Sequence, residues 1–193
     1  MKPLDPTKRE NILDAVYRIV GRKGLAGVSI KEISMQANLG IGSIYTYFSG
    51  KEEVIEAAFF YAEHNITTMM FTGLDINAPV KKSLAKIYFN ALKYRLKHYD
   101  EAVFIDQYMQ SNYVQINLAK QFKEYEAQHL PLYSVIKKGQ EEGILNNLPP
   151  FLMINYFLGV VRSTSNGMLQ RVIPLNKMNI TYSFNMAWRG LCI

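Results

Sequence analysis

The sequence predicts an all-α protein of about nine helices, and three observations support this fold class. Apolar residues recur at helical spacing along most of the chain, as at Ile12, Val16 and Ile19. Residues that start helices precede several of these runs, as Ser29 and Glu32 do. Glycine and proline separate the runs, for instance at residues 149–150. We therefore expect an N-terminal three-helix domain followed by a larger helical domain.

The first predicted helix runs from the Asp5-Pro6 pair to the segment before Gly24. Aspartate caps a helix start and proline suits the first helical position. Arg22 and Lys23 in the last turn, followed by glycine, favour a helix end at that point. Its apolar stripe would pack behind the next two helices.

A helix-turn-helix is predicted between Ser29 and Phe48. Ser29 and Glu32 have the spacing of a capping box. Asn38 tolerates the left-handed conformation that ends helices, and a second short helix can begin after Gly40. Such units place the second helix in the major groove of DNA.

A longer helix follows the motif. Ser49 and Glu52 repeat the S-x-x-E spacing, and apolar residues continue at helical spacing to about Phe71. A helix of roughly twenty residues is expected there.

These residues resemble the DNA-binding domain of the TetR family of bacterial transcriptional regulators. The family's central pattern is similar to the run from Ile33 to Val54, which reads I-x-x-x-A-N-L-G-x-G-S-I-Y-x-Y-F-x-x-K-E-x-V. Asn38 stands where the family usually has glycine, and Gly40 stands where serine or threonine usually caps the recognition helix. The resemblance implies a helix-turn-helix DNA-binding domain over residues 1–50. It also implies a helical effector-binding and dimerisation domain over residues 51–193.

The second helix of the motif would meet DNA with short or aromatic side chains. It carries no arginine, so bidentate readout of guanine is not expected from it. Ile41 can press against a thymine methyl group, and the resemblance implies that Tyr45 and Lys51 contact phosphates. One of Tyr45 and Tyr47 is expected to pack inward. The predicted DNA-binding residues are Ser29, Lys31, Ile41, Gly42, Ser43, Tyr45, Tyr47 and Lys51.

The remaining chain is predicted to be helical as well. A helix starts after Pro79, Asp100 is expected to cap the next one, and a long helix extends from Val114 to Glu142. Pro131 inside that long helix predicts a kink or a break. The last two helices are expected over residues 150–172 and 176–191.

Apolar residues cover more than one stripe of each of the last two helices, which suggests a second buried face. The resemblance implies that these helices form a four-helix bundle with those of a second subunit. The alternative is that they only close the core of one subunit. The predicted dimer contacts are Phe157, Val160, Val161, Thr164, Met168, Phe184 and Trp188.

The resemblance also implies a pocket for a small-molecule effector among the middle helices. Tyrosine combines an apolar ring with a polar tip, so an apolar or aromatic effector is expected. The alternative is plain core, which is the more common role of such residues at helical spacing. The predicted pocket residues are Tyr88, Phe104, Tyr108, Met109, Tyr125, Tyr133 and Tyr156. No metal site is predicted, because His98 and His129 lack partners at metal-ligand spacing.

Composition restricts the class of protein further. Residues 1–51 contain eight lysines and arginines but four acidic residues, which suits phosphate binding. The single cysteine, Cys192, excludes an internal disulfide and suits a reducing compartment. The start of the chain lacks the apolar core of a signal peptide, and no apolar run is long enough to span a bilayer. A cytoplasmic protein without membrane contact is expected.

The sequence therefore predicts a DNA-binding transcriptional regulator, most simply a repressor. It would bind a palindromic operator as a homodimer and be released by its effector. No catalytic residue or cofactor is predicted, since G-x-S-x-G, H-E-x-x-H, P-loop and dinucleotide-binding motifs are missing. The alternatives are a DNA-binding protein without an effector and an all-α enzyme.

Overall fold

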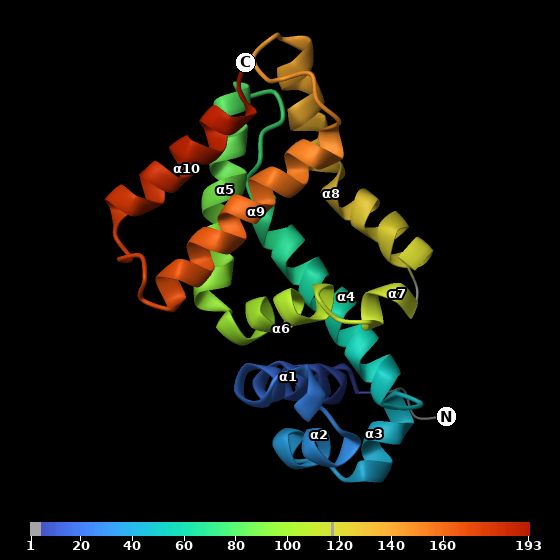
Figure 1. Cartoon of the computed structure of the whole chain (residues 1–193). Helices are drawn as coiled ribbons and strands as arrows, with labels where there is room; N and C mark the ends of the chain where they lie inside the picture. Colours follow the sequence, from blue (N-terminus) through green and yellow to red (C-terminus); the bar gives the residue numbers. More distant parts are fainter. Residues whose placement is uncertain (1–4, 117) are drawn as a thin grey trace. The chain divides into compact units, whose positions relative to one another are not determined.

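The structure is a computed structural model that describes residues 5–116 and 118–193 (Figure 1). Its regular elements in these ranges are the α-helices α1 to α10 and one 3₁₀ turn, η1 (Leu25–Gly27). Leu145 and Cys192 also form an isolated antiparallel β-bridge. The predicted all-α fold class is confirmed.

The chain divides into two compact units, each described here by itself. The first comprises Met1–Asn65 and His98–Gln121, and the second comprises Ile66–Lys97 and Phe122–Ile193. Helix α4 (Lys51–Met70) contributes residues to both units. A division into compact units does not show which residues bind DNA and which bind an effector. The predicted boundary between the two functional domains at residue 50 therefore stays a prediction.

Helix α1 (Pro6–Lys23) begins and ends as the sequence predicts. The Asp5 carboxylate accepts a hydrogen bond from the Thr7 amide at 3.0 Å. Gly24, with φ of 71°, follows the last helical residue. The apolar stripe of the helix is buried, so α1 serves as the support of the first unit.

Helices α2 (Ile30–Ala37) and α3 (Ile41–Tyr47) form the predicted helix-turn-helix. The Ser29 hydroxyl accepts a hydrogen bond from the Glu32 amide at 3.2 Å, which caps α2. Asn38 ends α2 in the left-handed region, with φ of 54° and ψ of 46°. Both local signals in the sequence are therefore used by the fold.

Helix α6 (Tyr99–Met109) packs with α1 and α4 in the first unit, and the short α7 (Tyr113–Ile116) follows it. The Gln107 side-chain carbonyl accepts a hydrogen bond from the Leu25 amide at 2.8 Å. The ring of Tyr108 stacks on that of α4 Phe59, with centroids 4.0 Å apart. These contacts attach α6 to the helices that carry the helix-turn-helix.

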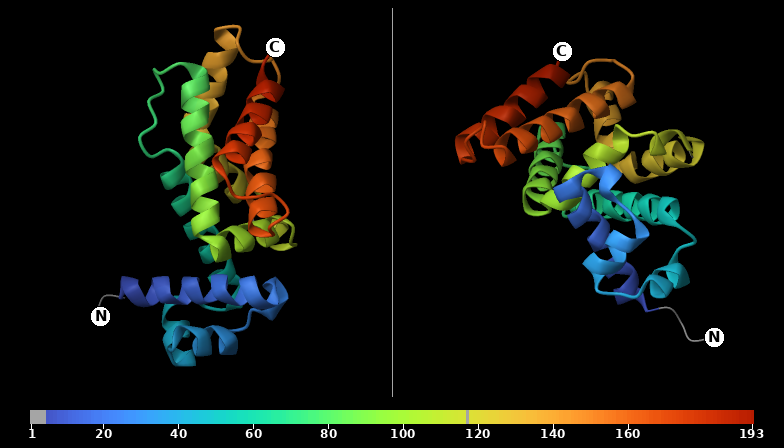
Figure 2. Two further views of the ribbon diagram at one scale, coloured as in Figure 1. Left: turned by 90° about the vertical axis from the view of Figure 1, so that its left-hand side faces the viewer. Right: turned by 60° about the horizontal axis from the view of Figure 1, so that its bottom comes forward.

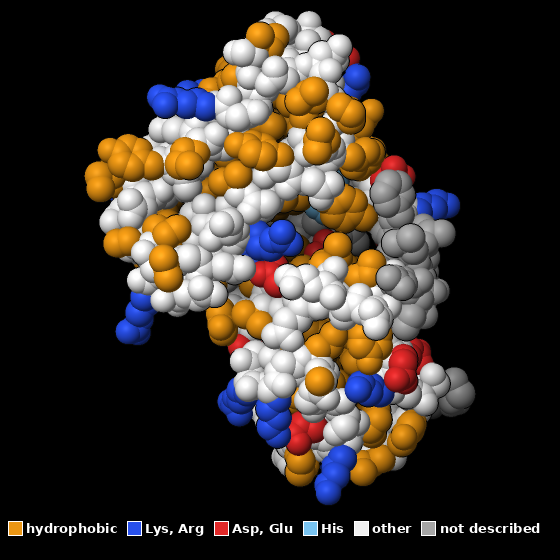
Figure 3. All heavy atoms as spheres, in the orientation of Figure 1, with side chains coloured by type: hydrophobic (Ala, Val, Ile, Leu, Met, Phe, Trp, Pro, Cys, Tyr) orange, Lys and Arg blue, Asp and Glu red, His pale blue; other side chains and the backbone are white. Residues whose placement is uncertain are grey.

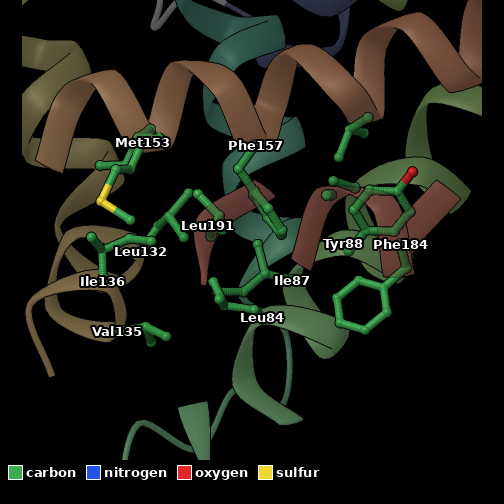
Figure 4. Packing of buried hydrophobic residues seen from close by; sticks show 14 of the residues in the cluster. Leu84, Ile87, Tyr88, Leu132, Val135, Ile136, Met153, Phe157, Phe184 and Leu191 are labelled. Atoms are coloured by element: carbon green, nitrogen blue, oxygen red, sulfur yellow. The ribbon is translucent and has the colours of Figure 1, made fainter. Parts of the chain in front are cut away.

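Besides the end of α4, the second unit contains four helices, of which α5, α9 and α10 lie side by side in both Figure 1 and Figure 2. These helices are α5 (Val80–Lys97), most of α8 (Leu118–Glu141), α9 (Pro150–Leu169) and α10 (Lys177–Leu191). Tyr88 of α5 packs edge-on against Phe157 of α9 and Phe184 of α10, with centroids 5.8 and 5.5 Å apart (Figure 4). Leu132 and Ile136 of α8 complete the same core.

Two predicted helix caps differ in the structure. Helix α6 starts after His98, so Asp100 lies in the first turn and is not the cap. At the start of α4, the Ser49 amide donates to the Glu53 carboxylate at 2.6 Å, and the predicted pairing with Glu52 is not formed. Because α4 begins only at Lys51, the carboxylate that faces Ser49 is one residue further along.

The long predicted helix corresponds to two described helices, α7 and α8, and residue 117 between them lies outside the described residues. Helix α8 continues through Pro131, so of the kink or break predicted at that proline the break does not occur. Within the described ranges, no helix combines the length and apolarity needed to cross a membrane.

Candidate nucleic-acid interface

Buried apolar side chains hold the helix-turn-helix in place. Ile33 of α2 and Ile44 of α3 have no exposed surface, and Phe48, which follows α3, is buried as well. The guanidinium carbon of α1 Arg9 lies 5.6 Å from the centroid of the Phe48 ring. Because one edge of α3 is buried in this way, its opposite face is presented to solvent.

The solvent face of α3 is apolar and aromatic. Residues 41, 42, 45 and 46 share one side of the helix, at positions i, i+1, i+4 and i+5. Ile41 is 46% exposed and Tyr45 is 55% exposed, which is unusual for side chains of this size. A Cβ built on Gly42 would meet nothing within 4 Å. Helix α3 contains no charged residue, so this face offers apolar contact and hydroxyl groups only.

Two other residues predicted on α3 are less accessible. Tyr47 is half-buried, and its hydroxyl accepts a hydrogen bond from the Asp5 amide at 3.1 Å, which joins the end of α3 to the start of α1. Ser43 is also half-buried. Of the two tyrosines, Tyr47 forms a contact within the first unit, and Tyr45 is exposed to solvent.

The sequence motif does not single out Thr46, which the structure places on the solvent face of α3. Its hydroxyl donates to the Gly42 carbonyl at 3.0 Å. The hydroxyl proton is therefore used within the helix, while the methyl group stays available. Its spacing from Ile41 and Gly42 is the signal that could have identified it.

Three of the predicted DNA-binding residues lie on the helices before and after α3. Ser29 and Lys31, at the start of α2, are exposed, and the Ser29 hydroxyl also caps that helix. Lys51 is half-buried as the first residue of α4. Hydrogen bonds from Ser49, above all from its backbone amide, lower the pKa of the neighbouring Glu53 carboxyl. An ionised carboxylate therefore lies close to Lys51 in the chain.

The residues predicted for an effector pocket are divided between the two units. Phe104, Tyr108 and Met109 belong to the first unit. Phe104 and Tyr108 are buried, with ring centroids 6.0 Å apart, whereas Met109 is exposed.

The other four predicted pocket residues belong to the second unit. Tyr88 is buried, and its hydroxyl donates to the α9 Thr164 hydroxyl at 3.3 Å. Tyr125 and Tyr133 of α8 are half-buried, and Tyr156 of α9 is exposed. Of the seven, only Tyr88, Phe104 and Tyr108 are fully enclosed by protein.

The residues predicted for dimer contact lie mostly inside the second unit. Those that are buried there are Phe157, Val161, Thr164, Met168 and Phe184. Val160 and Trp188 are half-buried. A helix with a broad apolar surface has an inner and an outer stripe, and the sequence pattern does not tell which stripe faces the subunit's own core.

The outer stripes of α9 and α10 carry exposed apolar residues that are not among the predicted dimer contacts. They are Leu152, Tyr156, Met178, Tyr182 and Met186. Figure 3 shows apolar side chains distributed over the surface of these two helices. A groove of about 540 Å³ opens on the same side, and its lining includes Tyr156, Gly159, Ser163 and Met186. We call this surface, with its five exposed apolar residues, the α9/α10 face.

The part of the chain that the structure describes contains no group of three or more His, Cys, Asp or Glu side chains that could hold a metal ion.

By its geometry, the first unit carries a DNA-binding helix-turn-helix, with a supported second helix and an accessible outer face. The sequence profile described as "Bacterial regulatory proteins, tetR family" matches residues 12–58, which contain α2, α3 and most of α1. This match places the helix-turn-helix region of the chain in the TetR family.

Curated relatives match this N-terminal region. The HTH-type transcriptional regulator BetI of Brucella suis biovar 1 is 27% identical over 82 residues, which cover 42% of this chain and 38% of BetI. An HTH-type transcriptional regulator of Haemophilus influenzae is 38% identical over 66 residues, covering 34% and 33% of the two chains. The chain thus spans less than two fifths of the length of either relative.

Solved structures match nearly the whole chain. A TetR family transcription regulator from Marinobacter aquaeolei VT8 superposes with a TM-score of 0.88 at 19% identity, covering 97% of both chains. The fatty acid degradation regulator FadR from Bacillus halodurans superposes with a TM-score of 0.73 at 18% identity, covering 97% and 95%. At such low identity these matches establish a shared fold.

Proposed function

We propose that this protein is a transcriptional regulator that binds double-stranded DNA through α3. The observation that carries the proposal is the solvent face of α3, which lies opposite the fully buried Ile44. An α-helix of this width enters the major groove, and a fixed helix presents its side chains to base edges in a defined register.

Groups on the flanking helices support the proposal. Lys31 and Lys51 supply positive charge on either side of α3, and the exposed Ser29 hydroxyl lies at the start of α2. Contacts from such groups to phosphates position a protein on DNA, while contacts in the groove supply sequence specificity. We assign phosphate contact to Ser29, Lys31, Tyr45 and Lys51, and base contact to the rest of the α3 face.

We further propose that the protein acts as a homodimer through the α9/α10 face. A contiguous apolar surface on a folded unit marks a protein contact. Dimerisation places two helix-turn-helix motifs on one duplex, and two-fold symmetry then requires a palindromic operator. Dimerisation also compensates for the modest affinity expected of a single helix-turn-helix that lacks strong polar contacts to bases.

The proposed mode of action is repression that is relieved by a small apolar or aromatic effector. FadR, whose fold this chain shares, is named as a regulator of fatty acid degradation, and the second unit of this protein contains the buried aromatic side chains Tyr88, Phe157 and Phe184. In a thermal-shift screen with a chemically broad library, apolar compounds should raise the melting temperature. Stabilisation by highly charged compounds alone would contradict an apolar effector.

Selection from a random pool of double-stranded DNA tests the DNA-binding proposal. The full-length protein should enrich one palindrome, and the Tyr45→Ala variant should enrich it poorly. Enrichment of no sequence, with binding that disappears at moderate salt, would contradict sequence reading and favour nonspecific phosphate binding.

A further inference from the structure

The solvent face of α3 lacks the side chains that read most base edges. Guanine and adenine are read by bidentate contacts from Arg, Lys, Asn or Gln, and cytosine is read by Asp or Glu. Helix α3 has none of these residues, since its sequence is IGSIYTY. The nearest long cation on the preceding helix, Lys31, acts as a point charge and does not form a planar fork.

What the face does offer is methyl groups. Ile41 is 46% exposed and presents a branched aliphatic side chain. Thr46 is exposed, and its hydroxyl donates to the Gly42 carbonyl at 3.0 Å, so it cannot donate the same proton to a base. Gly42 lies between them in sequence, and the open space around it allows the helix backbone to approach the groove closely.

We propose that this protein reads its operator half-site chiefly through the C5 methyl groups of thymine, with Ile41 and Thr46 as the contacting residues. This inference rests on the proposed DNA-binding function. The thymine methyl is the apolar group of the major-groove base code, and it is the partner that aliphatic side chains recognise there. The base pairs recognised in each half-site should therefore be A·T pairs, positioned so that the thymine methyl group contacts Ile41 or Thr46.

Deoxyuridine provides a direct test, because it lacks only the C5 methyl group and keeps the hydrogen-bonding edges of thymine. Thymines in the selected palindrome are replaced one at a time, and affinity is measured by fluorescence anisotropy at fixed salt. Each contacted methyl should be worth about three- to fivefold in Kd, as expected for burial of one methyl-sized group. Replacement of thymines outside the half-sites serves as the control and should leave Kd unchanged.

Thr46→Ser is the matched protein variant. It removes the methyl group but keeps the hydroxyl that bonds to Gly42, so α3 should remain folded, which a thermal melt verifies. On the thymine operator this variant should bind about three- to fivefold more weakly. At the one thymine per half-site that Thr46 contacts, replacement by deoxyuridine should not weaken the binding of Thr46→Ser any further. The substitution in the protein and the replacement in the DNA remove the same methyl contact.

The outcomes separate this inference from the proposed function. A selected palindrome whose deoxyuridine forms bind as tightly as the thymine form overturns methyl readout and leaves the DNA-binding proposal intact. Deoxyuridine losses of equal size in the wild type, in Thr46→Ser and in Ile41→Ala overturn the assignment to these two residues. Failure to select any sequence overturns both proposals.

Discussion

Ile44 and Tyr45 are neighbours on α3, yet one is buried and the other is exposed to solvent. Ile44 has no exposed surface, and Tyr45 is 55% exposed. Burial makes the first side chain a support of the fold, whereas exposure leaves the second accessible for the proposed contact with DNA. Folding and recognition can therefore be separated within one turn of helix.

Substitution of each residue by alanine tests this separation. Ile44→Ala should lower the free energy of unfolding by about 2–5 kcal/mol, because it removes a fully buried side chain and leaves a cavity. Tyr45→Ala should change it by less than about 0.5 kcal/mol but weaken operator binding. Urea denaturation and fluorescence anisotropy measure the two effects. Strong destabilisation by Tyr45→Ala would show that its ring packs inward.

His129 is a second residue whose environment has a measurable consequence. Burial lowers its pKa, and a hydrogen bond between Nδ1 and the Tyr125 carbonyl opposes this only in part. The unfolded chain, with a histidine pKa of about 6.5, then binds the proton more readily than the folded protein does. Stability should be unaffected by this residue above that pH and should decrease as the pH falls below it.

The His129→Gln variant should therefore lose less stability than the wild type between about pH 7.5 and pH 5.5. Melting temperatures measured across this range report the difference. Parallel curves for wild type and His129→Gln would mean that His129 takes up its proton without penalty in the folded state.

At the scale of elements, the turn between α2 and α3 sets the register of the recognition helix. Asn38 holds the left-handed conformation that ends α2, with φ of 54°. The Leu39 amide then donates to the Ser34 carbonyl at 3.1 Å, and the Ser34 hydroxyl donates to the Leu39 carbonyl at 2.6 Å. The turn is thus fixed by one backbone conformation and two reciprocal contacts.

Two substitutions of Asn38 test the conformational part of this account. Asn38→Ala should cost about 1–2 kcal/mol of unfolding free energy, because a Cβ-bearing residue without a polar side chain is disfavoured at positive φ. Asn38→Gly should be neutral to within a few tenths of a kcal/mol, since glycine adopts this conformation freely. Urea denaturation distinguishes them. Equal losses for both variants would indicate that the asparagine side chain itself is required.

The comparison of sequence and structure also belongs at this scale. Signals that depend on adjacent residues predicted the caps at Asp5, Ser29 and Asn38 correctly. The predicted caps of α4 and α6 were wrong. Several neighbouring residues near each helix start can act as caps, and the path of the backbone into the helix determines which of them does. Thr46 was missed for a related reason: the exposure of one helix side depends on how α3 is packed.

At the scale of the whole molecule, sequence reasoning assigned a partner contact to α9 and α10 and named residues that lie mostly in the core of the second unit. Phe157 and Phe184 pack within the subunit, and Tyr182 and Met186 are among the residues left outside. Apolar content is a property of sequence, but the division of two apolar stripes between core and surface depends on tertiary packing. The dimer itself remains a prediction.

A charge placed on the α9/α10 face tests the dimer and its link to DNA binding together. Met186 is 69% exposed, so Met186→Glu should leave the fold of a single subunit unchanged. In a dimer closed by this face, the carboxylate would be buried without a partner, and the dimer dissociation constant should rise at least about tenfold. Sedimentation velocity should then show monomers at concentrations where the wild type is dimeric.

Ile76→Glu is the matched control, because Ile76 is 51% exposed but lies in the loop before α5. It should remain dimeric and bind the palindrome like the wild type. Met186→Glu should bind the palindrome much more weakly while keeping the wild-type affinity for a single half-site, because each head is unchanged and only their linkage is lost. A dimeric Met186→Glu variant with full operator affinity would place the partner contact elsewhere on the chain.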